Sequence, residues 1–242
     1  MKIVTIEQMR AIETRSERAG VSTETLMDNA GLAVAERVRC HIGALDGASI
    51  VVLVGPGNNG GDGLVAAGLL RDWGASVTAF MCLERTQPNP KLEALEAKIG
   101  DAIPVWRGDG YRALENALPN ADLILDALLG TGRARPIEGP LKRVLDLMQV
   151  TTAIPSGPTL VALDTTTGLD ADSGAVDRSS VPADITISLG YPKRGHYAHP
   201  GAEYSGRLEV VDIGIPPDLG EDVDLTLLTS DWARIALPSR PA

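Results

Sequence analysis

The feature that most constrains this chain is the glycine-rich run at residues 55–63, Gly-Pro-Gly-Asn-Asn-Gly-Gly-Asp-Gly. The apolar run 50–54 precedes it, and a helix-patterned stretch, residues 64–73, follows. Five glycines in nine residues let backbone N–H groups turn inward without interference from Cβ atoms. A helix that begins there adds positive potential. The run therefore predicts a phosphate-binding turn at the carboxyl end of a strand, with two amides and a carboxylate beside it.

Composition narrows the fold and the partners. Hydrophobic residues make up 44% of the chain but aromatic residues only 3%, which favours layered α/β packing of aliphatic side chains. The 22 basic residues against 32 acidic ones give a net charge of −10, so we expect no nucleic-acid partner. No run approaches the roughly 20 apolar residues of a membrane span. We expect a cytoplasmic protein that does not bind membranes.

Apolar strand-like runs alternate with helical patterns along most of the chain. Two helices are predicted first, one from Thr5 to about Gly20 and one from about Thr23 to Ile42. The predicted strands are Ile50–Val54, Ser76–Cys82, Ile103–Trp106, Asp122–Asp126, Leu160–Asp164, Asp184–Leu189 and Leu208–Val211. The later predicted helices are Leu64–Trp73, Pro90–Ile99, Tyr111–Leu118 and Gly139–Met148. This alternation indicates a mainly parallel sheet covered on both faces, with N-terminal helices. We assign residues 1–220 to one domain and 221–242 to a tail.

The glycine run has two interpretations besides a phosphate cradle. Gly55, Gly57 and Gly60 satisfy the G-x-G-x-x-G pattern of dinucleotide-binding folds. Asn58, Asn59 and Asp62 fit that pattern poorly, because they crowd polar side chains into the turn. The other interpretation is a plain turn in which Asn and Asp are turn formers and a helix cap. A P-loop is excluded because no Lys-Ser or Lys-Thr pair closes the run.

Polar loops follow three further predicted strands. Asp126 leads into residues 130–136, where backbone amides and two arginines can hold a phosphate, unless this is an ordinary strand–helix connection. Asp164 is followed by three threonines, which suit a sugar or a hard cation, unless they form a turn and a helix cap. Lys193, after the next strand, either reaches a ligand phosphate or lies in a solvated loop. No catalytic triad and no zinc spacing is present.

Taken together, these loops resemble one family. Residues 57–63, 126–132 and 184–187, with Pro192-Lys193, resemble the NAD(P)H-hydrate epimerase family, the YjeF N-terminal domain, as do residues 26–31 and 212–216. The resemblance implies a three-layer α/β/α Rossmann-like fold and a homodimer. It also implies interconversion of the R and S epimers of hydrated NADH and NADPH (NADHX and NADPHX), which carry a hydroxyl at C6 of the nicotinamide ring. A partner dehydratase uses only the S epimer.

The resemblance also assigns roles to residues. Those implied to bind the substrate are Asn58, Asn59, Gly60, Gly61, Asp62, Gly130, Thr131, Gly132, Arg133, Ala134, Arg135, Pro136 and Asp164. Asn59, Asp126 and Thr167 are implied to bind one potassium ion. The family pattern Asp-Ile-Pro-Ser-Gly reads Asp-Thr-Thr-Thr-Gly here, at residues 164–168. Thr167 keeps the hydroxyl oxygen, so we expect the ion site to survive the loss of the proline.

Epimerisation at C6 requires proton transfer when hydroxide leaves and water returns. Asp164 and Asp126 are the expected catalytic residues, with Asp126 alternatively confined to holding potassium. One competing hypothesis is a non-catalytic nucleotide-binding or scaffolding module, as in an mRNA-decapping factor that resembles the family. Another is a nicotinamide dehydrogenase. The complete glycine run, with Asp126 and Asp164, favours an enzyme.

The end of the chain carries a further resemblance. Residues 229–240 resemble the junction that leads into an ADP- or ATP-dependent dehydratase domain in bifunctional members of the family. We therefore expect this chain to be the N-terminal half of a bifunctional repair enzyme.

Overall fold

The computed structural model describes residues 1–84, 89–100, 102–132, 136–228 and 230–236, with the side chains of residues 230 and 231 left out. Its centre is a seven-stranded parallel sheet in the order β3-β2-β1-β4-β5-β6-β7. The strands are β1 Ser49–Val54, β2 Ser76–Met81, β3 Ile103–Pro104, β4 Leu123–Ala127, β5 Thr159–Leu163, β6 Ile185–Leu189 and β7 Arg207–Val211. The predicted parallel sheet is confirmed.

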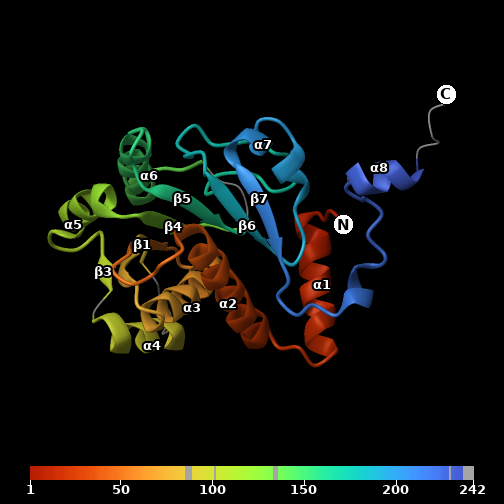
Figure 1. The fold of residues 1–242 in the computed structure, drawn as a ribbon, viewed down its shortest axis with the longest axis horizontal. Coiled ribbons are helices and arrows are strands. Elements are labelled where there is room, and N and C mark those ends of the chain that lie inside the picture. The colour runs from red at the N-terminus through yellow and green to blue at the C-terminus, as the bar shows by residue number, and fades with distance from the viewer. Residues whose placement is uncertain (85–88, 101, 133–135, 229, 237–242) are drawn as a thin grey trace.

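Helices cover both faces of this sheet (Figure 1). On one face lie α2 (Thr23–Ile42), α3 (Asn58–Asp72) and α4 (Pro90–Ile99), and on the other α5 (Gly110–Ala117) and α6 (Gly139–Thr152). Every residue of β4 is buried, as expected for a strand covered on both sides. The fold is the three-layer α/β/α sandwich that the sequence predicts.

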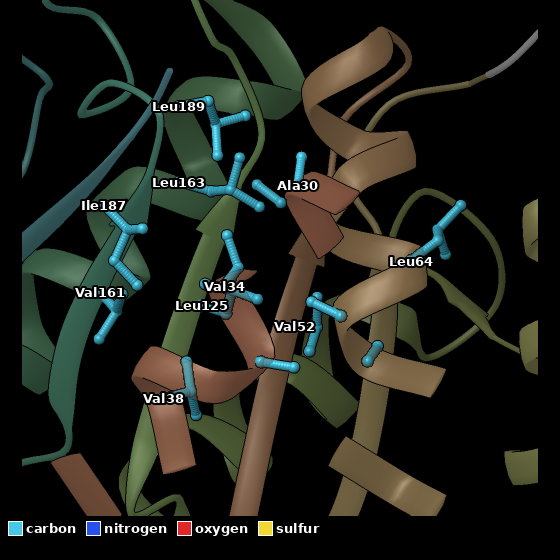
Figure 2. Packing of buried hydrophobic residues seen from close by; sticks show 14 of the residues in the cluster. Ala30, Val34, Val38, Val52, Leu64, Leu125, Val161, Leu163, Ile187 and Leu189 are labelled. Carbon is cyan, nitrogen blue, oxygen red and sulfur yellow. The ribbon is translucent and has the colours of Figure 1, made fainter. Parts of the chain in front are cut away.

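The core between α2 and the sheet shows why these elements pack. Ala30, Val34 and Val38 form one stripe of α2 and meet Val52 of β1 and Leu125 of β4 (Figure 2). All five side chains are buried. Burying an aliphatic side chain contributes about 1.5–3 kcal/mol, so this stripe fixes α2 on the sheet.

The N-terminal segment lies beside the loop that follows β6. Helix α1 (Ile6–Arg18) begins at Thr5, whose side chain accepts the N–H of Gln8 while the Gln8 side chain accepts the N–H of Thr5. This is the capping box that the sequence predicts. Val4 pairs with Lys193, which brings α1 close to the loop after β6. Residues 225–227 pair with residues 1–3, and the last described helix is α8 (Ser230–Ala236).

Short elements complete the chain. They are the 3-10 turns η1 (Leu118–Asn120), η2 (Arg194–Tyr197) and η3 (Pro217–Gly220), and the single turn α7 (Gly201–Tyr204). Among the described residues, no helix is both long enough and apolar enough to cross a membrane.

Several boundaries differ from prediction, and two of them concern the core of the fold. The strand expected at Ile103–Trp106 is only Ile103–Pro104, although the N–H of Val105 still donates to the carbonyl of Met81 in β2. Helix α3 begins at Asn58, not at Leu64, so the polar half of the glycine run is helical. Glycine is a poor helix former. Packing of this segment against the strands and α2 outweighs that local preference.

The sheet order places the candidate site. The order in which the chain adds strands reverses between β1 and β4. After β1 the chain adds β2 and β3 on one side, and it then returns to add β4 to β7 on the other side of β1. In open α/β sheets, ligands bind outside the carboxyl ends of the strands at such a point. The glycine run follows β1, and Asp126 is the fourth residue of β4.

Candidate functional site

Two glycines bring α3 onto the strand ends. A Cβ atom on Gly55 would lie 1.7 Å from the carbonyl oxygen of Leu128, and one on Gly60 would lie 2.1 Å from the carbonyl oxygen of Gly55. Both positions therefore require glycine for close approach of backbones. The first turn of α3 consequently begins beside the end of β4, and the positive end of its dipole lies at the carboxyl edge of the sheet.

Asn59, in this first turn, has an unusual side chain. It is buried, yet neither its amide oxygen nor its amide nitrogen has a hydrogen-bond partner. A Cβ atom added to Gly130 would lie 3.1 Å from that oxygen, so the amide lies against the loop after β4. Buried polar groups are nearly always satisfied in native proteins. The free amide oxygen is therefore suited to a ligand.

Asp126 is hydrogen-bonded to Thr167 through both of its carboxylate oxygens. The Thr167 hydroxyl donates to Oδ1 of Asp126 at 2.8 Å, and the backbone N–H of Thr167 donates to Oδ2 at 3.2 Å. The N–H of Leu128 also donates to Oδ1. Burial raises the pKa of Asp126, although these hydrogen bonds oppose the shift. Among the described residues, Asp126 has no ion-pair partner.

These residues fit the potassium site that the resemblance implies. Asn59 offers an unpartnered oxygen, Asp126 a buried charge without a basic partner, and Thr167 a hydroxyl oxygen. Amide, carboxylate and hydroxyl oxygens are the hard ligands that such a cation prefers. Within the described ranges, no group of three or more His, Cys, Asp or Glu side chains is placed to hold a metal. Of Asn59, Asp126 and Thr167, only Asp126 belongs to those four residue types.

Asp164 follows β5 and forms the second acidic centre. It has a φ of 63°, in the left-handed region that non-glycine residues rarely adopt. Its Oδ1 accepts the N–H of Leu189 at 3.1 Å and forms an ion pair with the ammonium of Lys193. The two groups are only 8% and 1% exposed. The solvated-loop interpretation of Lys193 is therefore wrong: the pairing of residue 4 with residue 193 covers this lysine.

The charges of two more carboxyl groups interact with that of Asp164. Asp62 is buried in α3, and its pKa lies well above the usual range because of desolvation and then the charges of Asp164 and Glu13. Glu13 lies on the exposed side of α1, and its pKa is raised by partial desolvation and then by Asp164. Sequence reasoning included Asp62 but missed Glu13. No motif marks Glu13, since only the docking of α1 beside residue 193 brings it here.

His196 contacts the backbone of Lys193, next to the Lys193–Asp164 pair. Its Nδ1 accepts the N–H of Lys193, and its Nε2 lies 3.4 Å from the hydroxyl of Thr165. Desolvation and then the Lys193 charge lower the pKa of His196 to about 4. The imidazole is therefore neutral at physiological pH and supports the backbone of the lysine.

The remaining predicted substrate contacts lie at the rim. Asn58, Gly132 and Pro136 are exposed, whereas Gly60 and Gly61 are buried in the first turn of α3. Thr131 is half-buried. Arg133, Ala134 and Arg135 lie outside the described residues. The described residues among the predicted contacts thus follow or end β1, β4 and β5, which are neighbours in the sheet.

Comparisons with known proteins identify the family of this chain. Residues 23–195 match the family model described as YjeF-related protein N-terminus. A relative from Thermofilum pendens, named bifunctional NAD(P)H-hydrate repair enzyme Nnr, is 35% identical over 99% of this chain and 45% of its own length. One from Limosilactobacillus fermentum, named NAD(P)H-hydrate epimerase, is 36% identical over 86% of this chain and 95% of its own length.

A solved structure supports the same fold. The crystal structure of yeast ynu0 superposes with a TM-score of 0.77, covering 96% of this chain and 98% of that one, at 24% identity. The chain spans less than half the length of the bifunctional relative named above.

Proposed function

This chain belongs to the family described as YjeF-related protein N-terminus, and from that premise we propose that it interconverts the R and S epimers of NADHX and NADPHX. The observation that supports the proposal is the hydrogen bond from Thr167 to Asp126 at the end of β4. The unpartnered oxygen of Asn59 and the carboxyl group of Asp164 follow the two strands, β1 and β5, that flank β4. The relative named as an epimerase, which this chain matches over nearly its whole length, supports the same reaction.

The chemistry requires binding, orientation and proton transfer. The positive end of α3 and the N–H groups of the loop after β4 suit the diphosphate of the nucleotide. The ring nitrogen expels the C6 hydroxyl, which leaves an iminium ion, and water then adds to the opposite face. Asp164 lies at the strand end where a carboxylate can accept the proton of that water.

We propose that Asn59, Asp126 and Thr167 hold the potassium ion. An ion bound there supplies a fixed positive charge that orients the substrate. The buried Asp126, whose oxygens already accept hydrogen bonds, is better suited to this than to proton transfer.

The replacement Asp126→Asn tests the proposal. It removes the charge and keeps the shape, and we expect epimerisation of a purified R epimer to fall at least about a hundredfold. Chromatographic separation of the R and S hydrates measures the rate, and circular dichroism checks folding. Asp122→Asn, at the opposite end of β4, is the matched control and should keep wild-type activity. Full activity of Asp126→Asn would reject the role, and an inactive wild type would favour a scaffolding module.

Further proposals rest on the family resemblance. We propose that the chain forms a homodimer, which light scattering of the purified protein tests. We also propose that it works with an ADP- or ATP-dependent dehydratase domain, as the names of the bifunctional relatives suggest. Cytoplasmic location stays a prediction, which cell fractionation tests.

A further inference from the structure

Three carboxyl groups and one lysine from four separate segments interact through their charges, and two of them, Lys193 and Asp164, form a buried ion pair. Glu13 comes from α1, Asp62 from α3, Asp164 from the end of β5 and Lys193 from the loop after β6. The charge of Asp164 raises the pKa of both Asp62 and Glu13, and Lys193 opposes both shifts. The four groups therefore form one electrostatic unit.

Within this unit, Lys193 donates a hydrogen bond to Asp164 alone. Its ammonium donates to Oδ1 of Asp164, to the hydroxyl of Ser188 at 3.2 Å and to the carbonyl of Leu189 at 3.1 Å. An ammonium group has three protons, so these acceptors use all of them. Lys193 has no donor left for Asp62 or Glu13.

Asp62 is the carboxyl group in the least favourable place for a negative charge. Its side chain is buried, and within the described part of the chain it has no ion-pair partner. Glu13, by contrast, is exposed to water and has the charge of Arg10 to favour its ionised form. His196 is neutral and adds no positive charge. The proton shared by this cluster therefore belongs on Asp62.

We propose that Asp62 is the catalytic residue that carries the proton for the departing hydroxyl, and that Lys193 is a positioning residue that holds Asp164 as the carboxylate base. This assignment rests on the proposed function and deepens it. It gives the acid role to Asp62 and leaves Asp126 to the ion.

The proton balance of one turnover follows from this assignment. When the C6–O bond breaks, Asp62 gives its proton to the hydroxyl, which leaves as water, and the lone pair of the ring nitrogen forms the C=N bond. A water molecule adds to C6 from the other face and gives one proton to Asp164, while the C=N electrons return to nitrogen. The extra proton then passes through solvent from Asp164 to Asp62. Lys193 favours this return because it restores the ion pair.

A titration of the free protein tests the cluster without activity. Carbon-13 labelling of aspartate carboxyl groups, with Asp62→Asn to assign the signal, should show Asp62 losing its proton above the usual pH range of aspartate. Glu13→Gln should lower that midpoint by roughly half a unit to one unit, because it removes a nearby negative charge. Glu17→Gln, one turn further along α1 and also exposed, is the matched control and should leave it unchanged.

The same variants are then compared in the epimerase assay. Glu13→Gln should move the basic limb of the pH profile of kcat/KM downward by the same amount, and Lys193→Met should move the acidic limb upward. A purely structural lysine would lower the rate without moving either limb. If Lys193→Met does not fold, Glu13→Gln alone decides the test.

The outcomes separate this proposal from the proposed function. An Asp62 signal in the ordinary range, or one unmoved by Glu13→Gln, overturns the acid assignment whether or not the protein epimerises. A wild type with the expected titration and no epimerisation overturns the proposed function, and with it the catalytic role of Asp62.

Discussion

Two buried aspartates at neighbouring strand ends have different hydrogen-bond and charge partners. Asp126 in β4 receives a hydroxyl and two backbone N–H groups, from Thr167 and Leu128. Asp164 after β5 receives the ammonium of Lys193 and one backbone N–H. They are only 2% and 8% exposed, so neither charge is well solvated by bulk water.

The difference matches the two roles that we propose for the site, an ion-binding half at Asp126 and a proton-transfer half at Asp164. Neutral donors leave the negative charge of Asp126 to be balanced from outside, which suits a bound cation. Lys193 balances the charge of Asp164 from within the protein. Asp164 therefore needs no bound cation, while Asp126 is suited to hold one.

The largest expected effect comes from Lys193→Met, which breaks the internal balance at Asp164. It leaves a buried carboxylate without its partner, and we expect a loss of about 3–5 kcal/mol in the free energy of unfolding. Urea denaturation at pH 7 measures it. The double variant Lys193→Met with Asp164→Asn removes both charges and should recover most of the loss. Equal losses in the single and double variants would show that the lysine acts through packing alone.

A smaller effect is expected at Asp126. Thr167→Val removes the hydroxyl that donates to Asp126 and keeps the shape of the side chain. We expect the potassium concentration needed for half-maximal activity to rise about 10- to 100-fold. Thr167→Ser should restore the wild-type value.

Thr166→Val is the matched control, because Thr166 is also buried and bonds to the carbonyl of Tyr204. A potassium dependence that is the same in Thr167→Val and wild type would remove the ion-binding half of the comparison.

The smallest effect concerns the contribution of Asp62 to stability. Because its pKa is raised in the folded protein, Asp62 costs stability as pH rises above about 3.9, the value in an unfolded chain. Asp62→Asn should therefore raise Tm at pH 8 by about 2 °C or more, the shift expected for about 1 kcal/mol. At pH 3.5 the two proteins should melt alike. Thermal denaturation at both pH values measures this, and a lower Tm at pH 8 would contradict it.

Residue patterns predicted the sheet and most of the site. Alternating apolar runs and helical stretches were enough for the layers, because strands buried on both faces need continuous apolar residues. Polar residues after β1, β4 and β5 converge because the carboxyl ends of parallel strands share one edge. Local patterns did not predict the helical start at Asn58, because its glycines disfavour a helix and only packing reverses that preference.

The sequence by itself determined the glycines that let Gly55 approach Leu128 and α3 approach Gly55, the acids at the strand ends and the family to which the chain belongs. Only the tertiary structure decided how their charges are balanced. The Lys193 ammonium is buried against groups at the ends of β5 and β6, and Val4, just before α1, pairs with residue 193. The charge of Glu13 on α1 interacts there with those of Asp164 and Lys193. Electrostatic interactions depend on distance and burial, and segments more than a hundred residues apart acquire both only when the chain folds.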